Sequence, residues 1–249
     1  MNDIFVKKVE QLISSADRNG VAYTSFLSEE EQQTALALLN KRKVIFDFES
    51  GIEPGQRKIL GVFGSDFDRQ YAVFPYYILW VSVSLTDRPL THRDYLGSLL
   101  GLGIRRDVIG DISVVSDGAY IAVCDVMCEY LLQNLTRIGH ASCRVERLPE
   151  GSVVQSKQEF LETVCLVTSN RLDCFVASIT NSSRKKSCER ILSGTVLMNG
   201  AVVTDTTKHL SLGDRLTIRG SGKYLIAQNP DECSVTGKGR LKVPIKKYQ

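Results

Sequence analysis

The sequence has 249 residues and a formal net charge of +3, with 43% hydrophobic and 24% charged residues. This composition is typical of globular chains of one to three domains, each able to bury a core without disulfides. The apolar stretch 76–85 is too short to span a bilayer, and the N-terminus lacks a cationic segment followed by an apolar run, so we expect a cytoplasmic protein with no membrane partner.

Residues 1–75 are predicted to form an N-terminal α+β region. Apolar residues at helical spacing predict helical structure over 3–40, and Ser28, followed by three glutamates, opens a second helix within that range. Two short alternating segments, 44–48 and 58–63, predict strands.

Residues 76–150 are predicted to form a ferredoxin-like domain, the topology also used by RNA-recognition motifs. The order β-α-β-β-α-β is the ferredoxin-like split motif, which serves many unrelated functions. The strand at 119–124 lacks the aromatic pattern by which recognition motifs stack bases, so we do not expect this sheet to read single strands. The six elements are 77–85 (strand), 91–102 (helix), 108–115 (strand), 119–124 (strand), 125–138 (helix) and 141–148 (strand).

A domain boundary is indicated at Pro149-Glu150-Gly151-Ser152, so we interpret 151–170 as a linker, part of which could form one more strand or helix. Seven scattered cysteines include no CxxC pair. We therefore expect small core residues of a reduced protein and neither a metal nor another cofactor.

Positive charge is concentrated in the last third of the chain. Residues 1–170 hold 17 Lys and Arg against 22 Asp and Glu, whereas residues 171–249 hold 14 against 6, a net charge of +8. A basic end on an acidic body points to a polyanionic partner for that end. Basic residues that serve solubility alone are the alternative.

Residues 171–235 are predicted to form two helices followed by short antiparallel strands. The first helix begins at Arg171, and the second is capped by Ser183 and stops at Gly194. Asn199-Gly200 is a strong hairpin signal. The predicted strands are 195–198, 201–203, 216–219 and 223–226.

Three cations, Arg184, Lys185 and Lys186, occupy the first turn of the second helix. Cations are disfavoured there, beside the positive end of the helix dipole and its unpaired amides. Lys186 and Arg190 add a like-charge pair at i,i+4 spacing. A phosphate at the helix start would reverse both penalties, so we predict a phosphate-binding surface. A solvated charged face is the alternative.

The same stretch closely resembles the S4-like RNA-binding domain. The motifs that carry the resemblance are Arg171-Leu172-Asp173, Ser183-Arg184, Gly194-Thr195-Val196, Asn199-Gly200, Gly213-Asp214 and Arg219-Gly220. Ser187 departs from the small Ala usual in the second helix. The resemblance implies a basic face toward RNA, with contacts from Arg171, Ser183, Arg184, Lys185, Lys186, Arg190, Asn199, Lys208 and Arg219.

Nearly the whole chain is similar to the bacterial YlmH family. The segments 92–104 and 109–112, followed by a terminal S4-like domain, carry this resemblance. It implies a helical N-terminus, a ferredoxin-like middle domain and a terminal RNA binder. It also implies work on the large ribosomal subunit carrying peptidyl-tRNA, in ribosome-associated quality control of stalled translation.

Two further basic segments are candidates for secondary RNA contacts. Arg105 and Arg106 follow the first helix of the middle domain and are either an RNA contact or an exposed turn. Lys238 and Arg240 lie in a basic tail, 236–249, that either extends the RNA footprint or is disordered.

We therefore expect a non-catalytic, monomeric RNA-binding protein whose partners are ribosomal RNA and transfer RNA. An RNA-modifying enzyme that docks its substrate through the S4-like domain is the main alternative. The sequence contains no Gly-x-Ser-x-Gly motif, no metalloprotease helix motif and no glycine-rich cofactor turn. A protein–protein adaptor linked to cell division, binding through the acidic body, is the third possibility.

Overall fold

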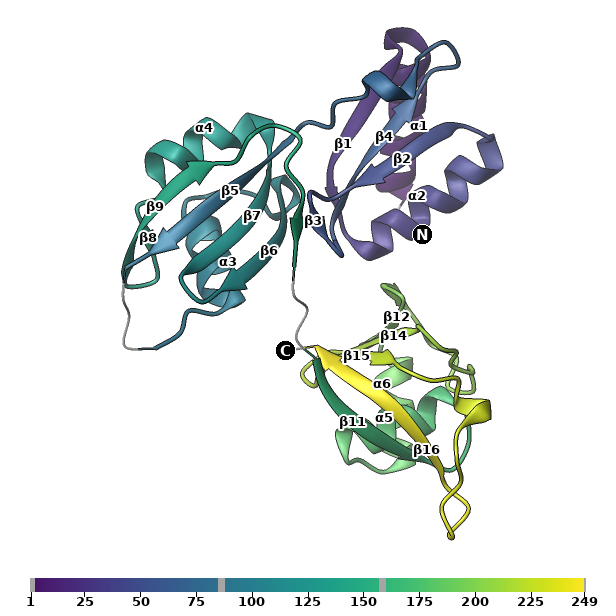
Figure 1. Ribbon diagram of the computed structural model, residues 1–249. Coiled ribbons are helices and arrows are strands. Elements are labelled where there is room, and N and C mark those ends of the chain that lie inside the picture. The colour runs from purple at the N-terminus through teal and green to yellow at the C-terminus, as the bar shows by residue number, and fades with distance from the viewer. Residues whose placement is uncertain (1–2, 85–87, 157–159, 249) are drawn as a thin grey trace. The chain divides into compact units, whose positions relative to one another are not determined.

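The computed structural model describes residues 3–84, 88–156 and 160–248. The chain forms two compact units, residues 1–157 and residues 158–249 (Figure 1). Helices and strands occur together in both units, so the protein is of the α+β class. Within the described ranges, no helix is both long enough and apolar enough to cross a membrane.

The first unit contains two larger sheets and a short two-stranded one. Its elements in chain order are α1 (Asp3–Asn19), β1 (Val21–Leu27), α2 (Glu29–Arg42), β2 (Ile45–Glu49), β3 (Ile52–Glu53), β4 (Lys58–Phe63), η1 (Arg69–Tyr71), β5 (Tyr76–Val83), α3 (His92–Gly101), η2 (Arg106–Val108), β6 (Ile109–Val115), β7 (Gly118–Cys124), α4 (Asp125–Asn134), β8 (Arg137–Ile138), β9 (Ala141–Arg147) and β10 (Val154–Gln155).

The N-terminal sheet has the order β1-β4-β2, and α1 and α2 bury their apolar faces against it. Continuous helical structure over 3–40 is wrong for Val21–Leu27, which pairs antiparallel with β4. Gly20, at φ 85°, stops α1, and the following β-branched and aromatic residues favour a strand. The second helix begins after Ser28, whose hydroxyl and backbone amide both bond to Glu31, as the capping pattern predicts.

The middle sheet has the order β6-β7-β5-β9-β8, and its elements follow the predicted sequence β-α-β-β-α-β. Helices α3 and α4 lie on one face of this sheet, where Tyr95 and Leu131 pack against Leu79 and Ile121 (Figure 1). The second helix ends at Asn134, before the predicted residue 138, because 137–138 pairs with 141–142 as β8. Leu85, the last residue of the first predicted strand, lies outside the described residues.

The N-terminal and middle regions each have a hydrophobic cluster of their own and meet in a third cluster, within one compact unit. Phe26 and Phe63 from the N-terminal sheet pack with Ile78 and Ala122 from the middle sheet. Strand β10, from the predicted linker, returns to pair in parallel with β3.

A polar joint holds the same two regions together. The Asp111 carboxylate accepts the backbone amides of Gln56 and Arg57 at 2.7 and 3.0 Å. The Arg57 guanidinium donates to the carbonyls of Phe26 and Ile109. The bonds to Asp111 and Ile109 link the N-terminal region to β6, whereas the bond to Phe26 fixes Arg57 to β1 of its own region.

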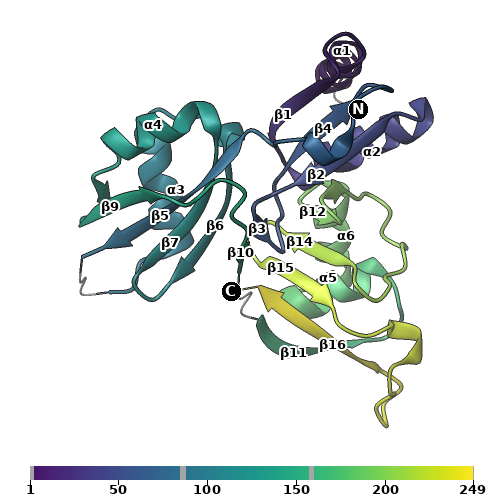
Figure 2. The ribbon, with the colours of Figure 1, turned by 45° about the horizontal axis from the view of Figure 1, so that its top comes forward.

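The second unit is one antiparallel sheet with two helices packed on one of its faces (Figures 1 and 2). The sheet order is β11-β16-β15-β14-β12-β13. Its elements are β11 (Phe160–Val167), α5 (Leu172–Thr180), α6 (Arg184–Leu192), β12 (Val196–Met198), β13 (Ala201–Val202), β14 (Arg215–Ile218), β15 (Gly222–Ile226), η3 (Pro230–Glu232) and β16 (Leu241–Tyr248).

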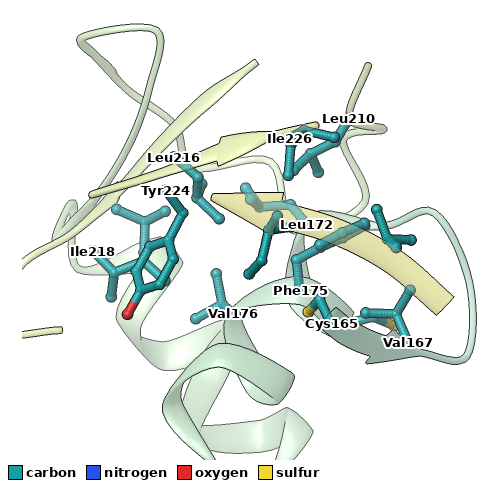
Figure 3. Close-up of a cluster of buried hydrophobic side chains, with 14 of the residues drawn as sticks. Cys165, Val167, Leu172, Phe175, Val176, Leu210, Leu216, Ile218, Tyr224 and Ile226 are labelled. Atoms are coloured by element: carbon teal, nitrogen blue, oxygen red, sulfur yellow. The ribbon is translucent and has the colours of Figure 1, made fainter. Parts of the chain in front are cut away.

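Leu172, Phe175 and Val176 of α5 point into the core of the second unit, toward Leu216 and Tyr224 of the sheet (Figure 3). These helix residues are the ones that the helical spacing assigns to one apolar face, because side chains three and four residues apart lie together. The predicted helices and hairpin strands are therefore present, each within one or two residues of its predicted bounds.

Two segments outside the predicted bounds of 171–235 complete this unit. Within the predicted linker, Phe160–Val167 forms the additional strand that the sequence left open, β11. The disordered alternative for the tail is wrong for Leu241–Tyr248, which is strand β16. Strand β16 lies between β11 and β15 and buries Val243 and Ile245. Pro244 interrupts the basic tail in sequence but occupies a regular position in the strand, opposite Val164.

Candidate nucleic-acid interface

Helix α6 begins as predicted, with Ser183 as its cap and three cations in its first turn. Ser183 has extended backbone, and its hydroxyl accepts the amide of Lys186 at 3.3 Å. Arg184, Lys185 and Lys186 then form the exposed first turn of the helix. Ser183 is thus occupied as a cap, which accounts for this residue without a contact to RNA.

A buried carboxylate joins the beginnings of α5 and α6. Arg171 donates to Asp173 through Nε and Nη2, at 3.2 and 3.1 Å, and Arg184 donates through Nε at 2.8 Å. The Asp173 side chain is 1% exposed, whereas that of Arg184 is 61% exposed. The group therefore carries a net single positive charge, and most of the Arg184 side chain is open to solvent.

The ionisation of Asp173 follows from these bonds. Burial raises the pKa of Asp173, but the hydrogen bonds from Arg171 and Arg184 outweigh it and lower the pKa to about 2. The carboxylate is thus charged at neutral pH and holds the two guanidinium groups in fixed positions. In the sequence, Asp173 stands out only as part of Arg171-Leu172-Asp173, and its role in bridging the two arginines becomes visible in the structure.

A shallow hollow beside α6 collects three of the predicted contacts, Lys186, Arg190 and Arg219. Lys186 and Arg190 are one helical turn apart, and Arg219 is brought to them because its backbone amide bonds to the Thr195 carbonyl at 3.0 Å. Lys186, Glu189, Arg190, Ser193, Thr195 and Arg219 line the hollow. Three cations against one carboxylate make it attractive to a phosphate.

Lys208 lies in the loop that covers the beginning of α5. The Lys208 carbonyl accepts the Leu172 amide at 2.8 Å, and the Thr206 carbonyl accepts the Asp173 amide at 3.0 Å. These first amides of α5 are therefore satisfied within the protein. Lys208 itself is exposed. Two hydrogen bonds from Thr207 lower the pKa of Asp205, and the positive charge of Lys208 lowers it further.

Asn199 has a structural role in the hairpin between β12 and β13. It adopts φ 52° and is followed by Gly200 at φ 84°, the left-handed pair that a tight hairpin requires. Its side-chain amide donates to Asp214 at 2.8 Å and accepts the Arg215 amide at 2.9 Å. These bonds fix the hairpin to β14 and account for Asn199 without RNA.

The secondary candidates have different surroundings. Arg105 is exposed and paired with Asp107 at 2.9 Å. The Arg106 guanidinium donates to the carbonyls of Ile109 and Gly110. Burial is the main cause that lowers the pKa of Arg106 to about 10, and the positive charge of Arg57 adds to it. Arg106 is thus directed into the protein and not toward an exposed turn.

The predicted tail residues Lys238 and Arg240 lie in the connection that precedes β16. Lys238 is exposed, and Arg240 joins Arg184 and Lys247 along a groove between α5 and β11. Lys247 belongs to the same basic tail. Its place follows from the alternation along β16, which was not recognised as a strand.

The described residues contain no cluster of three or more His, Cys, Asp or Glu side chains that could hold a metal ion. Five of the seven cysteines are buried, and Cys143 and Cys188 are half-buried. Burial raises the pKa of Cys124 and of Cys165 to about 11. These two thiols are therefore protonated at neutral pH.

Comparison with known proteins identifies the family. Residues 77–151 match the family model described as "Putative RNA-binding domain in YlmH". The "Ribosome-associated protein quality control protein P2" of Bacillus subtilis (strain 168) is 30% identical over 207 residues, which are 80% of this chain and 78% of that protein. The chain belongs to the YlmH family.

A solved structure titled "Cell division protein ylmH from Streptococcus pneumoniae" aligns with a TM-score of 0.50 at 19% identity. The alignment covers 59% of this chain and 91% of that one, and at this identity it shows a shared fold alone. In this YlmH-family chain, the segment that matches the family model lies in the first unit, whereas the cationic surface on α6 lies in the second.

Proposed function

We propose that this YlmH-family chain is a non-catalytic RNA-binding protein that docks on structured ribosomal RNA or transfer RNA through its second unit. In this proposal the second unit is an S4-like RNA-binding domain, and the β-α-β-β-α-β region of the first unit is a ferredoxin-like domain. The observation that carries the proposal is the convergence of Lys186, Arg190 and Arg219 on one hollow.

Electrostatics explain why this convergence favours an RNA partner. Three cations in one hollow repel one another, and that repulsion is relieved when an anion binds among them. The Asp173-bridged arginine pair adds a further fixed positive charge at the beginning of the same helix. Arginine guanidinium groups and lysine ammonium groups together suit the phosphates of a folded RNA backbone.

The ribosomal part of the proposal is supported by the relative from B. subtilis, whose title places it in ribosome-associated quality control. We propose the same setting here, with the large ribosomal subunit as the docking partner in rescue of stalled translation. The proposed role is to bind and orient. At neutral pH, the lysines and arginines of the surface act on phosphate as fixed charges and not as proton donors or acceptors.

Binding to purified ribosomal subunits and transfer RNA tests the proposal. The variant Lys185→Glu/Lys186→Glu/Arg190→Glu reverses three exposed charges on α6 and leaves the Asp173 cluster intact. We expect it to lose binding to large subunits and transfer RNA at low ionic strength. A control, Lys7→Glu/Lys8→Glu/Lys41→Glu, makes the same charge change on exposed positions of α1 and α2 and should bind normally. Equal loss in both variants would refute the site.

The enzyme alternative has its own test. The purified protein is incubated with ribosomal RNA and transfer RNA, and the RNA is then analysed by nucleoside mass spectrometry. A non-catalytic protein leaves every nucleoside unchanged at protein concentrations that saturate binding. A modified or cleaved nucleoside that disappears with the α6 variant would show an RNA-modifying enzyme that docks through this surface.

A further inference from the structure

The single tryptophan of the chain, Trp80, lies outside the hydrophobic core of the middle sheet. Side chains alternate between the two faces of a strand. Leu79 and Val81 face the helices α3 and α4, so Trp80 of β5 projects from the opposite face. Tyr120 of β7 does the same, because its neighbours Ala119 and Ile121 belong to the helix side.

Trp80 and Tyr120 are direct neighbours across the two central strands of this sheet. Their rings lie 4.7 Å apart between centroids at an interplanar angle of 40°. Both side chains are half-buried and therefore partly open to solvent. One end of this face, at Ile78 and Ala122, is covered by the N-terminal region, and Tyr120 packs against that cluster. The pair thus presents aromatic surface where the uncovered part of the face begins.

Gly118 makes room for the indole. A Cβ at this position would lie 2.8 Å from Cη2 of Trp80 and 2.3 Å from the carbonyl oxygen of Val81. Any side chain here would therefore displace the indole or the strand. The absence of a side chain lets the indole extend along the sheet surface, where a flat ligand can approach it.

Polar and charged groups surround the ring pair. In one row across the sheet, Glu146 flanks Trp80, and Ser113, which is buried and bonded to Ser156, flanks Tyr120. In the next row, Ser82 lies opposite Arg144. The Arg144 side chain is 82% exposed and pairs with Glu146 at 3.1 Å. Exposed ion pairs of this kind are weak, so a phosphate can take the place of the carboxylate.

We propose that Trp80 and Tyr120 form a stacking site for an unpaired RNA base, with Arg144 contacting the adjacent phosphate. Aromatic side chains on the central strands of such a sheet bind bases through their faces, and a polar surround suits a nucleotide better than an apolar peptide. The match of residues 77–151 to a family model described as RNA-binding selects RNA as the occupant. This inference goes beyond docking on structured RNA, because it concerns the other unit and a single-stranded ligand.

Intrinsic fluorescence of the intact protein tests the site, since Trp80 is its only tryptophan. Titration with single-stranded oligoadenylate should quench Trp80 in a saturable way, whereas an RNA hairpin without unpaired tails should not. Tyr120→Leu keeps the reporter and should raise the dissociation constant for oligoadenylate by roughly 5- to 150-fold, the loss expected for one base stack. Tyr120→Phe keeps the ring and should bind like the wild-type protein.

A second variant tests the charge without disturbing the ring pair. Arg144→Ser is an exposed substitution and should reduce the slope of log K against log salt for oligoadenylate by about 0.7, the share of one phosphate on a single strand. Circular dichroism, together with hairpin binding through α6, verifies that each variant is folded.

Three results would overturn the inference. The first is the absence of quenching by oligoadenylate at low ionic strength, which would leave a protein segment as the occupant of this face. The second is unchanged affinity in both Tyr120→Leu and Arg144→Ser. The third is loss of the quenching in Lys186→Gln/Arg190→Gln/Arg219→Gln, because that result would place single-strand binding on the second unit. Failure of the α6 surface to bind structured RNA would leave the quenching test unaffected.

Discussion

Neutralising the hollow beside α6 tests the proposed RNA surface quantitatively. The variant Lys186→Gln/Arg190→Gln/Arg219→Gln removes three positive charges that line one hollow and replaces them with neutral polar side chains. Each cation that neutralises a phosphate of an RNA helix releases condensed counterions, so log K falls with log salt by about 0.9 per contact, taking the value for duplexes.

The structure allows the slope to be worked out. Lys185, Lys186, Arg190 and Arg219 count as one contact each, and the arginine pair bridged by Asp173 counts as one because the carboxylate cancels one of its two charges. Lys208 lies beside Asp205 and is counted as neutral. The wild-type slope is then about −4.5 and that of the variant about −1.8.

Filter binding or fluorescence anisotropy with a transfer RNA between 50 and 200 mM salt measures this difference. Over that fourfold rise in salt, the wild-type protein should lose affinity by about 500-fold and the variant by only about 12-fold. The control Lys7→Gln/Lys8→Gln/Lys41→Gln lowers the net charge equally on α1 and α2 and should keep the wild-type slope. Equal slopes for the variant and the wild-type protein would refute the assignment of the hollow.

Three further outcomes follow from the structure. In the folded protein the pKa of Asp173 is about 2, below its ordinary value of 3.8, so the carboxylate contributes its full stabilisation above about pH 4 and loses it as the pH falls toward 2. Acid unfolding monitored by circular dichroism should therefore show a smaller loss of stability over this window in Asp173→Asn than in the wild-type protein. Parallel curves for the two proteins would contradict the ion pairs. Bound transfer RNA should slow alkylation of the half-buried Cys188 on α6 but not that of Cys143 in the first unit, as peptide mass spectrometry can measure. Asp111→Ala leaves the backbone amides of Gln56 and Arg57 without their acceptor. It should lower the free energy of unfolding of the first unit by roughly 2–4 kcal/mol, as denaturant titrations can measure. A change below the experimental error would show that these bonds to Asp111 are dispensable.

The helices of the second unit could be predicted because their signals are local. Ser183 is followed by its own capped helix, Gly194 adopts φ 71° where that helix ends, and Asn199 begins a left-handed pair. Each of these residues acts within a few positions of itself. Sequence alone therefore placed α5, α6 and the hairpin correctly.

The strand at Val21–Leu27, which the sequence did not predict, and the strand at Phe160–Val167, which it left open, depend on partners far away in the chain. Val21–Leu27 pairs with β4, and Phe160–Val167 pairs with a strand about eighty residues further on. The burial pattern of β11 has no clear alternation over its first half, because the strand lies at the edge of the sheet. Strand identity there is set by tertiary pairing, which a local pattern does not contain.

The aromatic pair was missed for a related reason. The strand at 119–124 by itself contains a single tyrosine, which does not make a stacking surface. Trp80 stands forty residues earlier and joins Tyr120 only when β5 and β7 become neighbours. Arg106 shows the opposite case, because its sequence context indicates an exposed turn although its guanidinium is bonded to buried carbonyls.

The geometry also changes the physical basis for a phosphate site on α6. From the sequence, the cations at the start of α6 predict a phosphate there. In the structure, however, Asp173 pairs with Arg184, and the Ser183 hydroxyl accepts the Lys186 amide. The penalty for cations beside the helix dipole and its unpaired amides is thus partly offset within the protein. The repulsion that the protein does not offset lies one turn later, where Arg190 and Arg219 face Lys186 with a single glutamate among them. An anion is therefore needed most in the hollow, and the variants there separate RNA binding from helix stability.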